Sequence, residues 1–153
     1  MPSSHKKNAE EQRQQWMRTM ALASMEDLEA AYQAAALNPA YRFLRPPESG
    51  TLMLRGGING DGADFNMGET TLTRCTVLLQ DGPSGTAYVL GRNHRKAELM
   101  ALCDALLQDR RYCGLIMLAV IKTLEEKHCK RMEAIRQRIS PTKVDFFTMA
   151  RGE

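Results

Sequence analysis

Residues 70–109 read TTLTRCTVLLQDGPSGTAYVLGRNHRKAELMALCDALLQD, and this stretch decides the fold. Residues 70–79 are rich in β-branched and apolar side chains, 81–85 have the composition of a turn, and 86–90 again suit a strand. Residues 94–109 then carry a broad apolar face at helical spacing, which is suited to packing on a sheet. The stretch therefore predicts a β-hairpin followed by a helix that covers it.

The flanking segments predict further helices and strands. Residues 10–23 place Trp16 and two methionines at helical spacing, and Ser24, with an acidic residue three positions later, resembles the N-cap of a second helix. The next residues alternate in short stretches broken by Pro46-Pro47, which predicts two short strands. After the central helix, an apolar run and a charged amphipathic pattern predict one or two helices before Pro141.

Strands that are joined by turns and bracketed by helical segments are typical of an α+β domain. We therefore expect an antiparallel sheet of short strands in the middle of the chain, packed against N- and C-terminal helices. The length of 153 residues favours a single domain over residues 1–153, and we expect the polar residues 1–8 to be disordered.

Composition argues against several classes of protein. Hydrophobic residues make up 43% and charged residues 25%, no apolar run is long enough to cross a membrane, and the polar N-terminus is not followed by the apolar segment of a signal peptide. A cytoplasmic location is therefore predicted. The 21 basic and 18 acidic residues are mixed along the chain, whereas nucleic-acid binding would favour a concentrated basic surface. The four cysteines form no C-x-x-C pair, which indicates free thiols and predicts neither a metal site nor a cofactor.

A glycine-rich segment at residues 56–62 contains four glycines in seven residues. It matches neither of the common phosphate-binding glycine patterns, and Ala63 and Asp64 fall at the wrong positions for a calcium loop. Both a plain hairpin loop or mobile flap and a loop that contacts a ligand or partner remain open.

Arg74 is the first candidate for binding an anion, and the nearby Glu69 is a further substrate-binding candidate. Arg74 follows Glu69 and three threonines, and its guanidinium could donate two hydrogen bonds to a phosphate or carboxylate. The alternative is an arginine on an edge strand, paired with Glu69 or left in solvent.

Arg92, His94 and Arg95 form the second candidate, because they lie where a strand should turn into a helix. Free backbone amides, the helix dipole and cationic side chains could converge there on an anion. The alternative is that Asn93 caps the helix and the basic residues are solvated. No nucleophile and base are arranged in a known catalytic pattern, so no catalytic residue is predicted.

The two ends of the chain are candidates for binding a partner. Trp16 lies on the amphipathic N-terminal helix, and the C-terminal segment is apolar and aromatic, so its side chains must be buried either on their own core or on another chain. The partner-binding candidates are Trp16, Val144, Phe146, Phe147 and Met149.

Three separated blocks carry a family resemblance. They are GETTLTRCTVLLQDGPSGTAYVLGRNHRKAELMALCDALLQ at residues 68–108, RQQWM at 13–17 and VDFFTMARG at 144–152. In this order they strongly resemble the PhnG family of the carbon-phosphorus lyase pathway, whereas residues 3–8 and 114–130 match the family pattern weakly.

The resemblance implies a subunit that works in bacterial use of phosphonates. PhnG-type subunits associate with PhnH-, PhnI- and PhnJ-type subunits in a core complex with two copies of each. With PhnI-, PhnH- and PhnL-type proteins they are required when methylphosphonate displaces adenine from ATP to give α-D-ribose 1-methylphosphonate 5-triphosphate. The nucleosidase-like chemistry is attributed mainly to the PhnI type, and carbon-phosphorus cleavage to the PhnJ type.

Two hypotheses follow. In the first, the chain is a non-catalytic, accessory subunit that folds onto a PhnI-type partner and supports its transferase site. In the second, it contributes a phosphate- or phosphonate-binding surface directly, with Arg74, Arg92 and Arg95 as anion donors. An unrelated small binding domain is a third, weaker reading.

Overall fold

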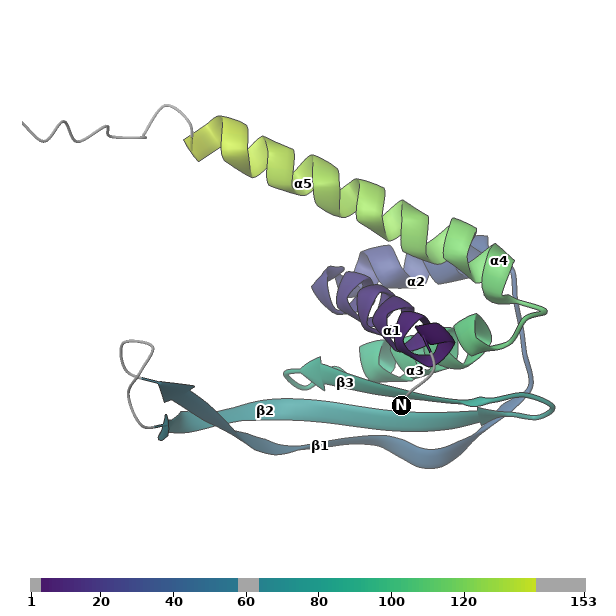
Figure 1. The fold of residues 1–153 in the computed structure, drawn as a ribbon, viewed down its shortest axis with the longest axis horizontal. Coiled ribbons are helices and arrows are strands. Elements are labelled where there is room, and N and C mark those ends of the chain that lie inside the picture. The colour runs from purple at the N-terminus through teal and green to yellow at the C-terminus, as the bar shows by residue number, and fades with distance from the viewer. Residues whose placement is uncertain (1–3, 58–63, 140–153) are drawn as a thin grey trace, which may run out of the picture.

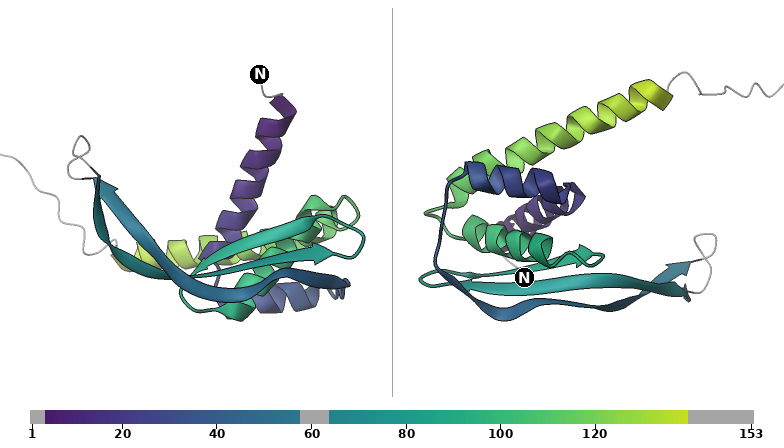
Figure 2. Two further views of the ribbon diagram at one scale, coloured as in Figure 1. Left: turned by 90° about the horizontal axis from the view of Figure 1, so that it is seen from below. Right: turned by 180° about the vertical axis from the view of Figure 1, so that it is seen from behind.

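The chain folds into a sheet with helices stacked on one face. The computed structural model describes residues 4–57 and 64–139, and side chains from residue 9 onward within them. The expected α+β class is confirmed: three strands form one antiparallel sheet, with α3 (His94–Gln108) directly against it and α1 (Ser4–Leu22) and α2 (Met25–Ala34) beyond α3 (Figure 1). The opposite face of the sheet is covered by none of the described elements (Figure 2).

The first two helices lie where their sequence patterns predict. Helix α1 begins at Ser4, inside the segment 1–8 for which the sequence predicts disorder, and residues 1–3 lie outside the described part. Ser24 caps α2, because its hydroxyl oxygen accepts a hydrogen bond from the backbone N–H of Asp27 at 3.1 Å. Such a cap satisfies one of the amides that the start of a helix leaves unpaired.

The sheet has the strand order β1 (Tyr41–Gly57), β2 (Asp64–Leu79) and β3 (Ser84–Leu90). The prediction of two short strands around Pro46-Pro47 is wrong, because the single long strand β1 passes through both prolines. β1 is an edge strand, where a missing amide hydrogen costs little, and shifts in its register between Phe43 and Glu48 leave both prolines outside the pairing with β2.

β3 is much shorter than the two strands before it, and it pairs with β2 only from Leu72 to Leu78. Beyond that region β1 and β2 continue as a two-stranded ribbon that extends past α3 and β3 (Figure 1). The strand reaches Gly57, so the predicted glycine-rich loop begins inside β1, and residues 58–63 lie outside the described part.

Helix α3 can approach the sheet closely because Gly85 has no side chain. A methyl group at Gly85 would overlap the backbone of Ala101 and Ala105 on α3. The core between and above these layers is apolar and includes Met20, Leu28, Val77, Met100, Leu106 and Val120.

After α3 the chain forms one continuous helical path made of three parts. These are α4 (Cys113–Ile116), a π-helical stretch η1 (Met117–Lys122) and α5 (Thr123–Ile139), which confirms the predicted helices before Pro141. Ile116 and Val120 are fully buried, whereas the far half of α5 leaves the body of the protein (Figures 1 and 2).

A buried carboxylate joins α1, α3 and β3. The side chain of Asp104 is fully buried and accepts hydrogen bonds from Nε and Nη2 of Arg13, at 3.0 and 2.7 Å. It also accepts from the indole N–H of Trp16 at 3.1 Å, the backbone N–H of Thr86 at 3.0 Å and the amide of Gln108 at 3.1 Å. A buried charge with so many donors is compensated, and it fixes α1 on the sheet–helix unit.

Candidate functional site

A chain of hydrogen bonds holds His94 at the start of α3. The hydroxyl of Thr73 donates to the carbonyl of Gly91 at 2.6 Å, and Ser49 Oγ lies 3.0 Å from both Thr73 Oγ1 and His94 Nε2. A hydroxyl has one hydrogen, so Thr73 must accept from Ser49, and Ser49 must accept from His94. Nε2 of His94 therefore carries a hydrogen, and Nδ1 remains as the second ring nitrogen.

The turn before α3 depends on Gly91 and Asn93. Gly91 has φ +88°, a left-handed conformation that glycine adopts easily. The side-chain oxygen of Asn93 accepts a hydrogen bond from the backbone N–H of Lys96 at 2.9 Å. The helix cap that the sequence offered as the alternative to an anion site is therefore present.

The cationic side chains near this turn are directed to partners within the chain. Arg95 forms ion pairs with Glu29 at 3.2 Å and Glu98 at 3.1 Å. Nζ of Lys96 donates to the carbonyls of Ala21 and Ala23, at 2.9 and 2.7 Å, and burial lowers the pKa of this lysine. Both contacts hold the neighbouring helices on α3 rather than leaving the charges to converge.

Arg92 differs from its neighbours. It is exposed, and within residues 4–57 and 64–139 it makes no hydrogen bond or ion pair with another side chain or the backbone. It therefore remains, with Nδ1 of His94, available to a ligand at this corner.

Glu98 also contacts the sheet. The hydroxyl of Tyr41 donates to Glu98 Oε1 at 2.6 Å. Burial, together with this carboxylate, raises the pKa of Tyr41 to about 12, so the phenol stays neutral and keeps its hydrogen bond at neutral pH. Glu98 thus links β1 to Arg95 and serves as a structural bridge.

Arg74 lies on the open face of the sheet, because strand side chains alternate and its neighbour Thr73 is buried on the helix side. Its Nε donates to Glu48 Oε1 at 2.7 Å, and Arg45 lies 3.6 Å from the same oxygen. The sequence-based alternative of an edge-strand arginine paired with Glu69 differs from this structure: β2 is the central strand and the acidic partner comes from β1. Glu69 is exposed, and its neighbour across the ladder is Met53.

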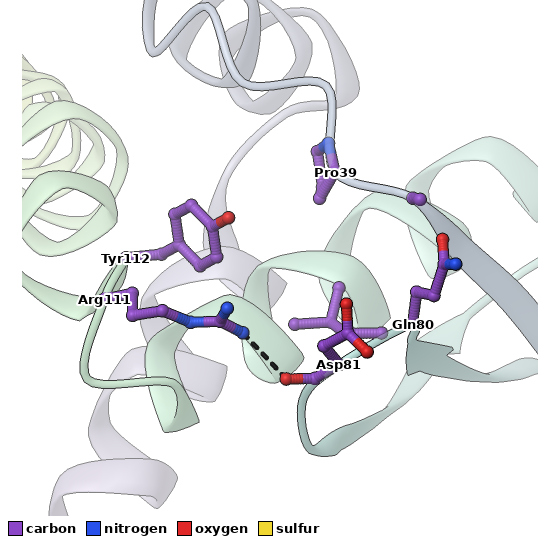
Figure 3. Close-up of a pocket in the computed structure, with 7 residues that line it drawn as sticks. Pro39, Gln80, Asp81, Arg111 and Tyr112 are labelled. Carbon is purple, nitrogen blue, oxygen red and sulfur yellow. Dashed lines mark hydrogen bonds between the residues drawn. The ribbon is translucent and has the colours of Figure 1, made fainter.

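A second polar corner lies where the β2–β3 turn meets the segment after α3. Pro39, Gln80, Asp81, Arg111 and Tyr112 line a cavity of about 100 Å³ (Figure 3). The guanidinium of Arg111 donates to the carbonyl of Asp81 at 2.7 Å and lies 5.4 Å from the centre of the Tyr112 ring.

Nη2 of Arg111, which donates to Asp81, also donates to Oδ2 of Asp109 at 2.6 Å, and Arg111 in turn lowers the pKa of the Asp109 carboxyl. The sequence analysis did not single out this corner, because Arg111 is separated from Asp81 by the whole of β3 and α3. Since Arg111 already has two partners, Asp81 and Asp109, the corner serves to join the turn to the helices.

The expected partner-binding residues lie in very different places. Trp16 is in the core, with only 7% of its surface exposed, so little of it is available to another chain. The C-terminal candidates at residues 144–149 lie outside the described residues. The structure instead exposes large apolar side chains along the β1–β2 ribbon, which the sequence analysis did not identify: Leu52, Met53, Leu54, Phe65 and Met67.

The described residues contain neither a metal-binding cluster nor a membrane-spanning helix. Among them, no three His, Cys, Asp or Glu side chains are grouped so that they could hold a metal ion. The described helices also include none that is both long and apolar enough to cross a membrane.

Comparisons with known proteins give a consistent family. A family model described as "Phosphonate metabolism protein PhnG" matches residues 11–152, which include every described strand and all helices except the first turns of α1. A protein from Rhizobium meliloti (strain 1021), "Alpha-D-ribose 1-methylphosphonate 5-triphosphate synthase subunit PhnG", is 38% identical over 146 residues, covering 93% of this chain and 90% of that protein.

Proposed function

The chain belongs to the PhnG family of phosphonate metabolism proteins, and from this membership we propose that it is a subunit of an α-D-ribose 1-methylphosphonate 5-triphosphate synthase. In that role it is needed when methylphosphonate displaces adenine from ATP during phosphonate catabolism. It supports the transferase site of the complex as an accessory subunit and performs no chemical step itself.

One observation carries the accessory role: two of the three candidate anion-binding arginines are engaged within the chain. Arg74 is paired with Glu48, and Arg95 with both Glu29 and Glu98. Releasing them toward a triphosphate would require breaking these ion pairs first. A side chain that already has an acidic partner serves the fold more readily than it serves a substrate.

The proposed partners are the PhnI-, PhnH- and PhnJ-type subunits, with two copies of each chain in the assembly. The PhnI-type protein is the proposed direct contact, and ATP and methylphosphonate are substrates of the complex as a whole. From the sequence, Val144, Phe146, Phe147 and Met149 remain proposed partner contacts. Deleting residues 144–153 should abolish co-purification with the PhnI-type subunit, and unchanged co-purification would remove that segment from the proposal.

The proposed function is tested by co-expressing the PhnI-type protein with and without this chain, followed by size-exclusion chromatography and an assay of adenine release from ATP and methylphosphonate. We expect co-elution, and adenine release that requires this chain. A partner that works equally well alone would refute the accessory role.

The alternative, a direct contribution to substrate binding, is supported by Arg92 and His94. Arg92, which precedes α3, has no partner among the described residues. His94 is held by Ser49 through Nε2, so that Nδ1 takes no part in this hydrogen bond. A charge-assisted contact to a phosphate contributes on the order of 1.5–3 kcal/mol, so its loss should lower kcat/KM roughly tenfold or more.

The matched pair for this alternative is Arg92→Ala and Arg110→Ala, measured in the assembled complex. Both arginines are exposed, but Arg110 follows the opposite end of α3. A lower kcat/KM for the Arg92 variant alone would support direct binding. Equal kcat/KM values for the two variants would refute direct substrate binding by Arg92 and leave the accessory role as the proposed function.

A further inference from the structure

The part of the sheet that lies beyond β3 is an arm, defined here as residues 50–57 of β1 and 64–71 of β2. β3 reaches only to Leu72 on β2, so in the arm each strand has just one neighbouring strand among the described elements. The arm extends past α3 in both views that show the sheet from the side (Figures 1 and 2). Two-stranded ribbons are only marginally stable in water, so this one is expected to require cover.

The arm carries large apolar side chains on both faces. Leu52 and Leu54 point to the open face and Met53 to the helix side, because strand side chains alternate. They are 46%, 42% and 47% exposed, and Met67 on β2 is 65% exposed. A strand beside water normally has one polar face, so apolar groups on both faces indicate that both become buried.

The outer edge of β1 is protected in one half and open in the other. Pro46 and Pro47 lack the amide hydrogen that an added strand would use, and the register shifts around them distort the edge. Residues 50–57 contain no proline. The edge that is free to pair therefore belongs to the same part of β1 that exposes the apolar side chains.

The charges of the arm define the surface that could receive it. Its described residues carry two acidic side chains, Asp64 and Glu69, and one basic side chain, Arg55, so its net charge is −2 + 1 = −1. A complementary partner surface is apolar and neutral to weakly basic. On the same open face, Tyr88 and Leu90 of β3 are also exposed and extend the apolar surface toward the body.

A second copy of this chain is a poor receiver for the arm. Of its cavities, the one between α1 and α5 has a volume of about 220 Å³ and is lined by Arg18, Glu125 and His128 among others. The one beside Tyr41 has about 260 Å³. Neither has the space for the five large side chains of the arm, and the first is too highly charged for them.

We propose that the arm inserts into an apolar, neutral-to-basic cleft of a different subunit of the synthase, which buries both of its faces and pairs with the outer edge of residues 50–57. This inference rests on the proposed function, because it names the surface by which the chain joins the complex.

The test compares two variants of the full chain, each co-expressed with the other subunits. Met53→Asp/Leu54→Asp places charge on both faces of the arm, and Leu118→Asp places it on η1, where Leu118 is 64% exposed. We expect the arm variant to associate roughly tenfold or more weakly than the wild type, since it buries charge in an apolar cleft, while the control associates normally. Circular dichroism of each isolated chain verifies that both remain folded.

Hydrogen exchange of the wild-type chain, alone and in the complex, gives a second measurement that needs no variant. We expect the amides of residues 50–57 and 64–71 to become protected on assembly. Normal assembly of the arm variant, or unprotected amides in a complex that does assemble, would overturn the inference while leaving the proposed function intact. If wild-type subunits fail to assemble at all, the proposed function itself fails. A wild-type homodimer that the arm variant dissociates would assign the arm to a second copy and overturn the inference.

Discussion

Asp104 offers the sharpest test of how this fold is held together. Replacing it by alanine removes one acceptor group from five hydrogen bonds. Arg13 is 43% exposed and Gln108 reaches the surface, so these two donors can turn to water. The indole N–H of Trp16 cannot, because its hydrogen bond is buried, and the backbone N–H of Thr86 is partly buried.

The expected loss in free energy of unfolding follows from these two donors, which Asp104→Ala leaves without their acceptor. A buried donor without an acceptor costs about 1–3 kcal/mol, whereas the guanidinium of Arg13 adds less because it is 43% exposed and stays hydrated. We therefore expect Asp104→Ala to lower the free energy of unfolding by about 2–4 kcal/mol. That is a large part of the roughly 5–15 kcal/mol that stabilises a typical domain. Asp104→Asn keeps the volume and one acceptor oxygen, and should fall between alanine and the wild type.

Urea denaturation followed by fluorescence measures this loss directly, because Trp16 is the chain's one tryptophan and its indole contacts Asp104. Asp81→Ala is the matched control, since this aspartate is exposed, and its free energy of unfolding should stay within about 0.5 kcal/mol of the wild type. If Asp104→Ala were as stable as Asp81→Ala, the carboxylate would not be the anchor of α1.

Four further predictions concern the packing, a helix cap, an ion pair and the thiols. Gly85→Ala should lower the free energy of unfolding by about 1–3 kcal/mol in urea, because the added methyl group pushes α3 off the sheet, and a fully stable variant would contradict the close approach. Ser24→Ala should cost about 1 kcal/mol in the same assay. Hydrogen bonds from Lys127 and Ser24 lower the pKa of Asp27 below its ordinary value of 3.8. The stabilisation that ionised Asp27 gives the fold is therefore complete above pH 3.8 and is lost as the pH falls through the folded-state pKa. The difference in free energy of unfolding between the wild type and Asp27→Asn should shrink as acid is added, and a constant difference would refute this prediction. Iodoacetamide should modify exposed Cys129 in the folded protein and spare Cys75, whose pKa burial raises to about 11, and equal labelling would contradict the buried position.

Local patterns in the sequence predicted the elements whose causes are local. The capping pattern at Ser24 and the turn predicted at residues 81–85 depend on neighbours in the chain; the cap is found where it was expected, and the turn occupies residues 80–83. The path of β1 was mispredicted because the effect of Pro46-Pro47 depends on whether the strand lies at an edge of the sheet. That position is a property of the whole sheet and cannot be read from the prolines.

The site residues depend on contacts between distant parts of the chain. Arg74 meets Glu48, which is 26 positions away, and Asp104 meets Arg13, which is 91 positions away. An aspartate on an apolar helix face gives a signal that such a partner is needed, but no signal of which residue supplies it. The exposed arm was missed for a related reason: it arises because β3 is shorter than β2, and strand lengths are compared only once the pairing is known.

The π-helical stretch η1 controls the direction in which the end of the molecule faces. A π-helical turn holds about one residue more than an α-helical turn, so the stretch from Met117 to Lys122 accommodates one extra residue without changing the phase of the helix that begins at Thr123. In a regular α-helix the same extra residue would rotate the far half of α5 by about 100°, so that it presented a different side to its surroundings. The wider turn thus acts as a phase adjustment between the buried start of this long rod and its projecting end.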